Sequence, residues 1–161
     1  MLVRTETTLT YAGAKVALDA ALARAEQIGV AFNVAVTDTA GTLLAFARMD
    51  GAFAVSGSIA QDKAWTVAGF GGLPTDVFYD AIAGEDAVRE GIGQRGRVAA
   101  FGGGVPVVVD GTFVGAVGAS GGSAAQDKDV AAAGAAAVAA ALDAVRLEAA
   151  GAHRQTREDA R

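Results

Sequence analysis

The feature that most constrains the fold is a pair of valine-rich runs, residues 105–109 and 112–119, separated by Asp110-Gly111. An Asp-Gly pair tolerates the positive φ angles of a type I′ turn, which joins two neighbouring antiparallel strands. A second pair of strand-like runs, residues 30–37 and 42–48, is joined by a similarly tight turn. Because connections this short cannot reach a parallel neighbour, the sheet is predicted to be mostly antiparallel.

Helical periodicity covers most of the remaining chain. The predicted helices span residues 11–28, 55–69, 76–83 and 126–148, while residues 85–97 carry no assignable pattern. Thr10 and Thr75 are the expected N-caps of the first and third helices, and Ser123 with Gln126 has the spacing of a capping box. Hairpins combined with helices, without strand–helix–strand crossovers, predict an α/β fold of the α+β type, with helices packed on the faces of the sheet.

The chain length of 161 residues suits a single domain. We expect this domain to cover residues 1–150, because no internal repeat or linker divides them. Residues 151–161 have no apolar face, and we expect them to form a disordered tail.

Composition argues against several classes of function. The net charge is −5 and no basic stripe is present, so nucleic acid is not an expected partner. The apolar stretches are interrupted before the roughly 20 residues that a membrane span needs. Residues 1–10 also lack an apolar signal core, so we predict a cytoplasmic protein without a membrane partner. Cysteine is absent and His153 is the only histidine, so we predict no metal site and no Ser-His-Asp triad in the folded domain.

Arg48, Asp50 and Lys63 form the most interesting group of charged residues. Arg48 and Asp50 lie two positions apart at the end of a predicted strand, and Lys63 lies on the following helix, close to Trp65. Such a trio can bind a carboxylate, with the arginine as a forked donor and the lysine as a point charge. It can equally be an ion-pair cluster that fixes a strand–helix corner. The residues alone leave both interpretations open.

Glycine-rich segments supply a second group of candidates. Ser120-Gly121-Gly122, ahead of the helix that begins near Gln126, can form an anion-binding nest at a helix N-terminus, although Asp127 would oppose an anion there. The alternative is a tight strand-to-helix turn followed by the capping box. Gly103 lets a flat ligand or another backbone segment approach closely, or else marks a kink at the start of a strand.

Several short strings also occur together in a recognisable order. They lie at residues 34–38, 48–52, 63–64, 74–75, 102–103, 110–111, 117–122 and 126–127. In this order, over roughly residues 8–145, the chain resembles the GlcG/HbpS-like family of haem-binding or haem-degrading domains, which includes the C-terminal domain of PduO-type corrinoid proteins. The resemblance implies a profilin-like fold with an antiparallel five-stranded sheet. It also implies assembly into dimers and commonly octamers, with haem or a related cofactor in some members.

Two main hypotheses for the function follow. In the first, the chain binds a small ligand, with haem or another tetrapyrrole as the leading candidate and with Met49, Tyr11 and Tyr79 as the conventional iron ligands within the domain. In the second, it is a cofactor-independent lyase, isomerase or hydratase for a small oxo or hydroxy acid. There Arg48 would hold the carboxylate while Asp50 or Lys63 moved a proton. A purely structural role in an assembly is a third hypothesis.

The candidate residues fall into two sets. The candidate catalytic residues are Asp50 and Lys63. The candidate ligand-binding residues are Arg48, Met49, Trp65, Gly103, Ser120, Gly121 and Gln126.

Overall fold

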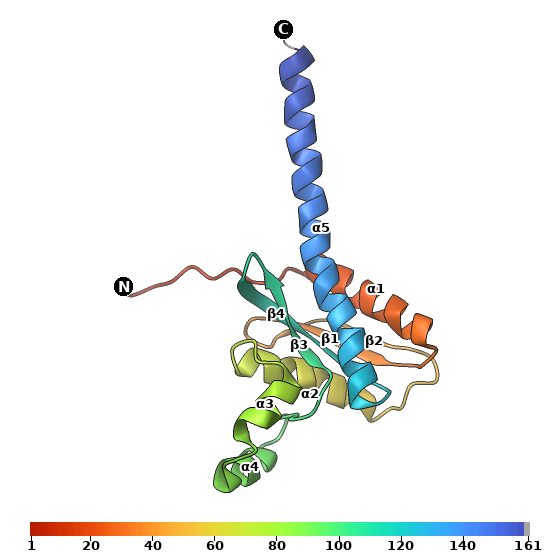
Figure 1. Cartoon of the computed structure of the whole chain (residues 1–161), viewed down its shortest axis with the longest axis vertical. Coiled ribbons are helices and arrows are strands. Elements are labelled where there is room, and N and C mark those ends of the chain that lie inside the picture. Colours follow the sequence, from red (N-terminus) through yellow and green to blue (C-terminus); the bar gives the residue numbers. More distant parts are fainter. Residues whose placement is uncertain (160–161) are drawn as a thin grey trace.

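A computed structural model describes the backbone of residues 1–159 and the side chains of residues 1–152. Its centre is a four-stranded antiparallel sheet with the strand order β2-β1-β4-β3 (Figure 1). The strands are β1 (Asn33–Asp38), β2 (Leu43–Arg48), β3 (Gly104–Val109) and β4 (Thr112–Ser120). Both predicted hairpins are present, and the predicted α+β class with an antiparallel sheet is confirmed.

The predicted number of five strands was wrong, because the sheet in the described residues has four. The chain ahead of the first helix reaches β4 but makes a single backbone hydrogen bond there, from the amide of Leu9 to the carbonyl of Val114 at 2.7 Å. An antiparallel ladder needs repeated paired bonds, so this segment does not become a strand. The hydroxyl of Thr8 instead accepts a hydrogen bond from the amide of Thr39 at 3.2 Å, in the turn between β1 and β2.

The turn between β3 and β4 has the predicted geometry. Asp110 has φ of 50° and Gly111 has φ of 74°, the two positive angles that a type I′ turn requires. A register shift between Val107 and Val108 then bends the hairpin.

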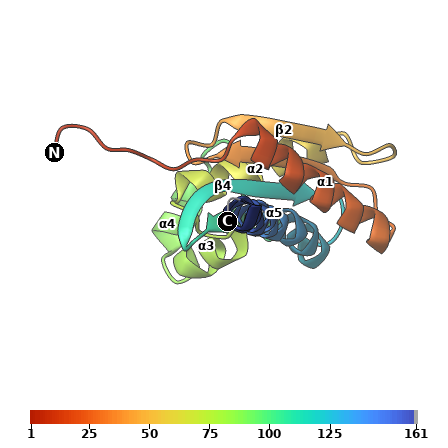
Figure 2. The same cartoon turned by 90° about the horizontal axis from the view of Figure 1, so that it is seen from above.

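Helices cover both faces of the sheet (Figures 1 and 2). α1 (Tyr11–Ile28) and the first part of α5 (Ala124–Asp159) pack together on one face, and α2 (Ser56–Gly69) packs on the other. Side chains alternate along β1, so that Val34 and Val36 join the core under α1 and α5, whereas Ala35 joins the core under α2. Gly118 of β4 allows α2 to approach closely, because a Cβ atom there would lie 2.0 Å from the carbonyl oxygen of Ala60.

The ends of the shorter helices follow the sequence only in part. α1 has the predicted bounds, with Thr10 as its N-cap and Gly29 in the left-handed conformation at its end. α3 (Thr75–Ile82) includes the residue that was expected to cap it. The buried hydroxyl of Thr75 accepts a hydrogen bond from the amide of Gly104 at 3.0 Å, so it ties the helix to the start of β3. α4 (Asp86–Gly93) lies in the segment that carried no assignable pattern.

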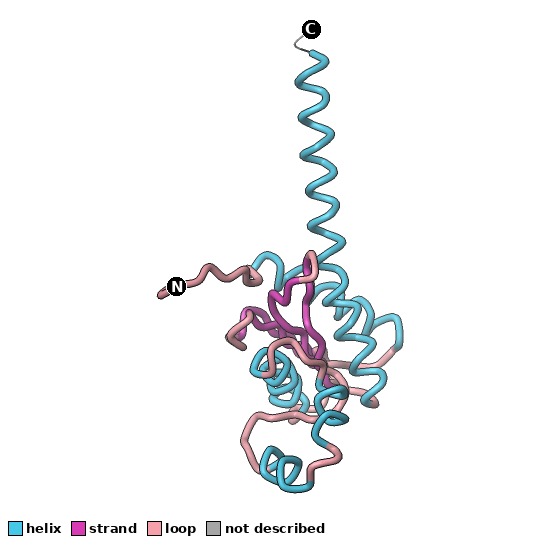
Figure 3. Tube along the Cα trace, turned by 60° about the vertical axis from the view of Figure 1, so that its left-hand side comes forward, coloured by secondary structure: helices cyan, strands magenta, loops and turns pink. Residues whose placement is uncertain are grey.

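α5 is longer than the predicted helix and projects from the domain (Figures 1 and 3). It continues past residue 148 to Asp159, so residues 151–159 of the expected tail are helical in the structure, and residues 160–161 lie outside the described residues. By length and composition alone, the segment Ala124–Ala152 is long and apolar enough to cross a membrane, although Asp143 and Arg146 interrupt its apolar run as predicted. The first part of this segment packs against α1, β3 and β4, whereas residues 143–152 are exposed.

Candidate functional site

Lys63 and Asp127 form an ion pair in the interior of the domain. The Nζ atom of Lys63, on α2, lies 2.5 Å from Oδ2 of Asp127, in the first turn of α5, and their side chains are 0% and 6% exposed. The same ammonium donates a hydrogen bond to the carbonyl oxygen of Ala119 at 3.0 Å and lies 4.7 Å from the centre of the Phe101 ring. The pair therefore joins helices on opposite faces of the sheet across the end of β4.

Asp127 also occupies the nest that the sequence offered to an external anion. Its Oδ1 atom accepts hydrogen bonds from the amides of Gly121 at 3.1 Å and Gly122 at 2.9 Å. These backbone donors are thereby satisfied from within the chain. Gly121 is placed by the structure in a turn closed by an internal carboxylate, and buried Ser120 is the last residue of β4.

The capping box is present as predicted. The amide of Ser123 donates to Oε1 of Gln126 at 2.9 Å, and the amide of Gln126 donates to the hydroxyl of Ser123 at 3.3 Å. The side chain of Gln126 thus satisfies an amide at the start of α5, which accounts for this residue without a ligand.

Gly103 gives the lysine room to reach its partners. Its φ angle is +124°, and a Cβ atom there would lie 2.6 Å from Nζ of Lys63 and 2.7 Å from the carbonyl oxygen of Ala119. The close approach predicted for this glycine is made in the structure by the lysine and by the backbone carbonyl of Ala119. Burial lowers the pKa of the Lys63 ammonium, and the hydrogen bond and charge of Asp127 oppose this shift.

The predicted trio of Arg48, Asp50 and Lys63 is not assembled. The guanidinium of Arg48 donates two hydrogen bonds to the carbonyl oxygen of Ala52, from Nε at 3.1 Å and from Nη2 at 2.9 Å. Asp50 is exposed. Among the hydrogen bonds and ion pairs of the described residues, Lys63 contacts neither of the other two. Neither the carboxylate site nor the ion-pair cluster proposed for this trio has geometric support.

Met49 and Trp65 are accounted for by packing. The Sδ atom of Met49 accepts a hydrogen bond from the amide of Phe32 at 3.3 Å, and its side chain packs against the core. The ring of Trp65 lies beneath the guanidinium of Arg97 at 4.9 Å, and Arg97 pairs with Asp62 at 3.2 Å.

A small cavity of about 320 Å³ lies beside Phe101, the ring that contacts the Lys63 ammonium. It is lined by Asp76, Tyr79, Asp80, Ala100, Phe101 and Gly102. Lys128 pairs with Asp76 at 2.5 Å. With Asp76 paired to Lys128, Asp80 still leaves this small cavity with a net negative charge, which disfavours an anionic ligand.

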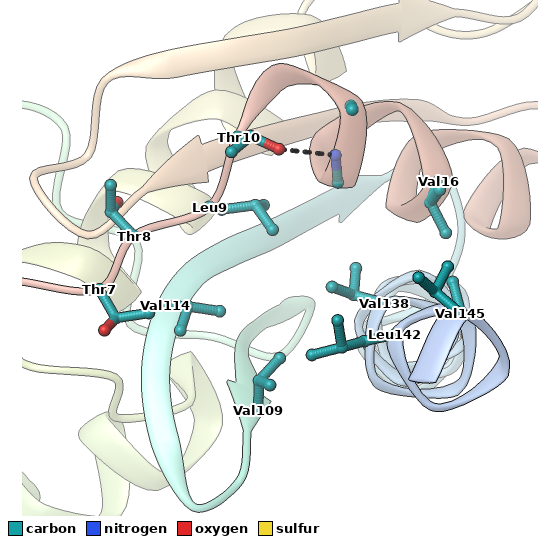
Figure 4. Close-up of a pocket in the computed structure, with 13 residues that line it drawn as sticks. Thr7, Thr8, Leu9, Thr10, Val16, Val109, Val114, Val138, Leu142 and Val145 are labelled. Carbon is teal, nitrogen blue, oxygen red and sulfur yellow. Dashed lines mark hydrogen bonds between the residues drawn. The ribbon is translucent and has the colours of Figure 1, made fainter. Parts of the chain in front are cut away.

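A second cavity, of about 420 Å³, was missed by the sequence analysis (Figure 4). We call it the apolar groove. It lies between the segment before α1, α1 itself, the β3–β4 hairpin and α5, and is lined by Thr7, Thr8, Leu9, Thr10, Ala12, Gly13, Val16, Val109, Val114, Val138, Ala141, Leu142 and Val145. Val138, Leu142 and Val145 repeat at helical spacing and could have indicated the stripe on α5. They could not indicate which partner surfaces leave it uncovered.

Two of the three threonine hydroxyls in the lining of the apolar groove already accept hydrogen bonds within the chain. Thr10 accepts a hydrogen bond from the amide of Gly13 at 3.2 Å, and Thr8 accepts one from the amide of Thr39 at 3.2 Å. The groove therefore presents aliphatic side chains to a ligand and few directional contacts.

The conventional iron ligands predicted from the sequence lie elsewhere. Met49 belongs to the core, Tyr79 lines the small acidic cavity, and Tyr11 is 65% exposed and does not line the apolar groove. The side chain of His153 lies outside the described side chains. The lining of the groove thus fits the apolar face of a macrocycle, but it does not supply a conventional axial ligand to a haem iron.

Comparison with known proteins places these features in a family. The family model for the haem degrading protein HbpS-like group matches residues 9–136. An uncharacterised 15.0 kDa protein from the dhaT-dhaS intergenic region of Citrobacter freundii is 37% identical over 122 residues, covering 75% of this chain and 85% of that protein.

Two solved structures extend the match to three dimensions. Protein ORFY of Klebsiella pneumoniae superimposes with a TM-score of 0.80 at 30% identity, covering 87% of this chain and 97% of the other. The complex of PduOC with haem superimposes with a TM-score of 0.73 at 33% identity, covering 81% of this chain and 95% of the other. The resemblance seen in the sequence is confirmed, and the chain belongs to the HbpS-like family, which is described as a family of haem degrading proteins.

Proposed function

We propose that this chain is a small-ligand-binding protein that holds a tetrapyrrole, with haem as the leading candidate, in the apolar groove. The observation that carries the proposal is the lining of the groove, in which valine and leucine side chains from α1, the β3–β4 hairpin and α5 converge (Figure 4). Its volume of about 420 Å³ is within the roughly 300–1,000 Å³ of small-molecule sites. The haem complex of the related PduOC domain supports this ligand class.

The energetic argument rests on apolar area. Removing apolar surface from water stabilises a complex by about 25 cal/mol for each Å². A tetrapyrrole is a flat, mostly apolar molecule, so one of its faces can cover Leu142, Val145 and Val109 without leaving a buried charge unpaired. The acidic cavity beside Tyr79 offers a poorer site, because Asp80 leaves it with a net negative charge that would repel the propionates of a haem.

Self-association is part of the proposal. We infer that the chain forms dimers and larger assemblies, as the family resemblance implies, and that the profilin-like designation of the fold applies. Light scattering coupled to gel filtration tests the assembly, and a monomer at all concentrations would contradict it.

The alternative function has no supporting geometry. Acid–base catalysis on an oxo or hydroxy acid was expected to use Arg48, Asp50 and Lys63 together. Lys63 is enclosed and already bonded to Asp127, and Arg48 is engaged by a backbone carbonyl. A substrate carboxylate would have to displace both sets of contacts.

The test is a visible-absorption titration of the full chain with haemin. We expect a Soret band that saturates at a fixed ratio, and a loss of affinity of about tenfold or more in Leu142→Asp, because a carboxylate in the groove opposes an apolar ligand. Leu147→Asp is the matched control, since Leu147 lies on the same helix, is 72% exposed and does not line the groove.

Other outcomes would reject the proposal. An unsaturable response of the wild type shows that haemin binds without a site. Equal affinity of the wild type and Leu142→Asp places the ligand outside the apolar groove. If Leu142→Asp lowers the assembly size while no haemin binds, the groove is an interface between copies of the chain.

A further inference from the structure

We infer that the apolar groove recognises the porphyrin macrocycle itself and accepts it with or without iron. This inference rests on the proposed function and narrows the class of ligand that the same site takes. It follows from two properties of the lining, namely its donor atoms and the state of the nearby charges.

The donor atoms come first. Side chains that conventionally hold a haem iron are those of histidine, cysteine, methionine and tyrosine. The residues that line the groove are threonine, leucine, alanine, glycine and valine. Two of the three threonine hydroxyls, those of Thr8 and Thr10, already accept hydrogen bonds from amides of the chain. Iron therefore gains no strong bond when it enters this groove.

Charged groups are the second property, because none of the residues that line the groove carries a charge. Arg4, Lys15 and Arg146 are the cationic residues closest in sequence to the lining residues among those whose side chains the structure describes. Arg4 pairs with Glu6 at 3.2 Å, and Lys15 pairs with Asp19 at 2.6 Å. Arg146 donates to both carboxylate oxygens of Asp110, at 3.0 and 2.6 Å.

A propionate that reached one of these three cations would have to displace a carboxylate that is already in place. The exchange of one carboxylate for another at an exposed cation changes the free energy little. The propionates are therefore expected to stay in solvent, at the open side of the groove. Binding then depends on contact between the macrocycle and the aliphatic lining, and neither iron nor ionic strength should change it much.

The experiment compares haemin with metal-free protoporphyrin IX on the full chain. Trp65 is the only tryptophan, so quenching of its fluorescence reports both ligands by the same signal. We expect the dissociation constants of the two ligands to agree within about threefold. A bond between iron and the protein worth about 1.4 kcal/mol would instead make haemin bind about tenfold more tightly. We also expect each constant to change by less than about twofold between 50 and 500 mM salt, because no ion pair is formed.

Leu142→Asp and its matched control Leu147→Asp complete the design. Leu142→Asp should raise the dissociation constants of both ligands by the same factor, and Leu147→Asp should change neither constant. Haemin binding that exceeds protoporphyrin IX binding by more than about threefold overturns the inference but leaves the proposed function standing. Failure of both ligands to bind rejects the proposed function itself.

Discussion

The first turn and the middle of α5 make contacts of opposite kinds. In its first turn, Asp127 reaches a fully enclosed lysine, and every oxygen of its carboxylate has a donor. About three to five turns further along the same helix, Val138, Leu142 and Val145 line the apolar groove, where the rest of the domain does not fully cover their aliphatic side chains. The chemically reactive groups are thus used to hold the domain together, and the groups without chemistry form the surface that a ligand can cover.

This contrast corrects a common inference about candidate sites. A buried lysine with a lowered pKa resembles a catalytic group, but structural ion pairs perturb pKa values as well. Here the ammonium has three partners, namely a carboxylate, a carbonyl and an aromatic ring. Because its partners are all internal and its side chain is enclosed, the Lys63 ammonium offers no accessible donor to a substrate.

The largest effect should come from breaking the buried ion pair. Lys63→Met leaves the carboxylate of Asp127 buried with its backbone donors alone, and we expect a loss of about 3 kcal/mol in the free energy of unfolding. Urea denaturation measures it. The control is Arg48→Met, which removes an exposed side chain bonded only to the carbonyl of Ala52 and should cost about 0.5 kcal/mol or less.

The double variant Lys63→Met/Asp127→Leu sharpens the result. Replacement of both partners by apolar residues should recover part of the lost stability, because no uncompensated charge remains in the interior. A double variant less stable than Lys63→Met alone would give a different result. It would show that the hydrogen bonds from the amides of Gly121 and Gly122 to Asp127 contribute more to stability than the removal of the buried charge recovers.

The next effect concerns the glycine that faces the lysine. Gly103→Ala adds a methyl group into contact with Nζ of Lys63 at a φ of +124°, so we expect a loss of about 3 kcal/mol from strain and overpacking. Gly29→Ala is the matched control, since its φ is +69° and nothing lies within 4 Å of the added atom. It should cost about 1 kcal/mol. Equal thermal shifts in the two variants would contradict the close contact at Gly103.

The smallest effect concerns the exposed ion pair between Arg146 and Asp110, which are the sequence neighbours of the groove residues Val145 and Val109. The hydrogen bond and charge of Arg146 lower the pKa of Asp110, so this pair stabilises the fold above the unfolded pKa of about 3.9. The stabilisation is lost as the pH falls through the lower pKa of the folded state. Arg146→Gln should therefore melt slightly below the wild type at pH 7, and the gap should close as the pH falls through the lowered pKa of Asp110 in the folded state. A gap that is constant with pH would mean that packing, and not the ion pair, accounts for it.

Local patterns were sufficient for much of the fold. Asp110-Gly111 specifies its own turn, because few residues adopt two successive positive φ angles. Thr10 and the pair Ser123 and Gln126 cap helices through bonds that span a few residues. Thr75 shows the limit of such patterns, since its hydroxyl turned away from the helix end to bind Gly104.

The candidate site depended on contacts between distant parts of the chain. Lys63 was predicted to be catalytic, but its partner in the structure lies 64 positions away and was not among the residues grouped with it. Arg48 and Asp50 were grouped with Lys63 because they are near in sequence. In the structure the guanidinium of Arg48 bonds to Ala52, in the segment between β2 and α2, and not to a residue of α2.

The sequence alone was enough to specify the hairpins, the caps of α1 and α5, and the family, because each depends on short-range backbone preferences or on short strings in sequence. The packing of α1, the hairpin and α5 decided which apolar side chains are buried and which remain in the groove. It also decided that the buried charge is satisfied internally. Burial and pairing are properties of surfaces brought together by the fold, and the same valine or lysine would serve either role in another arrangement.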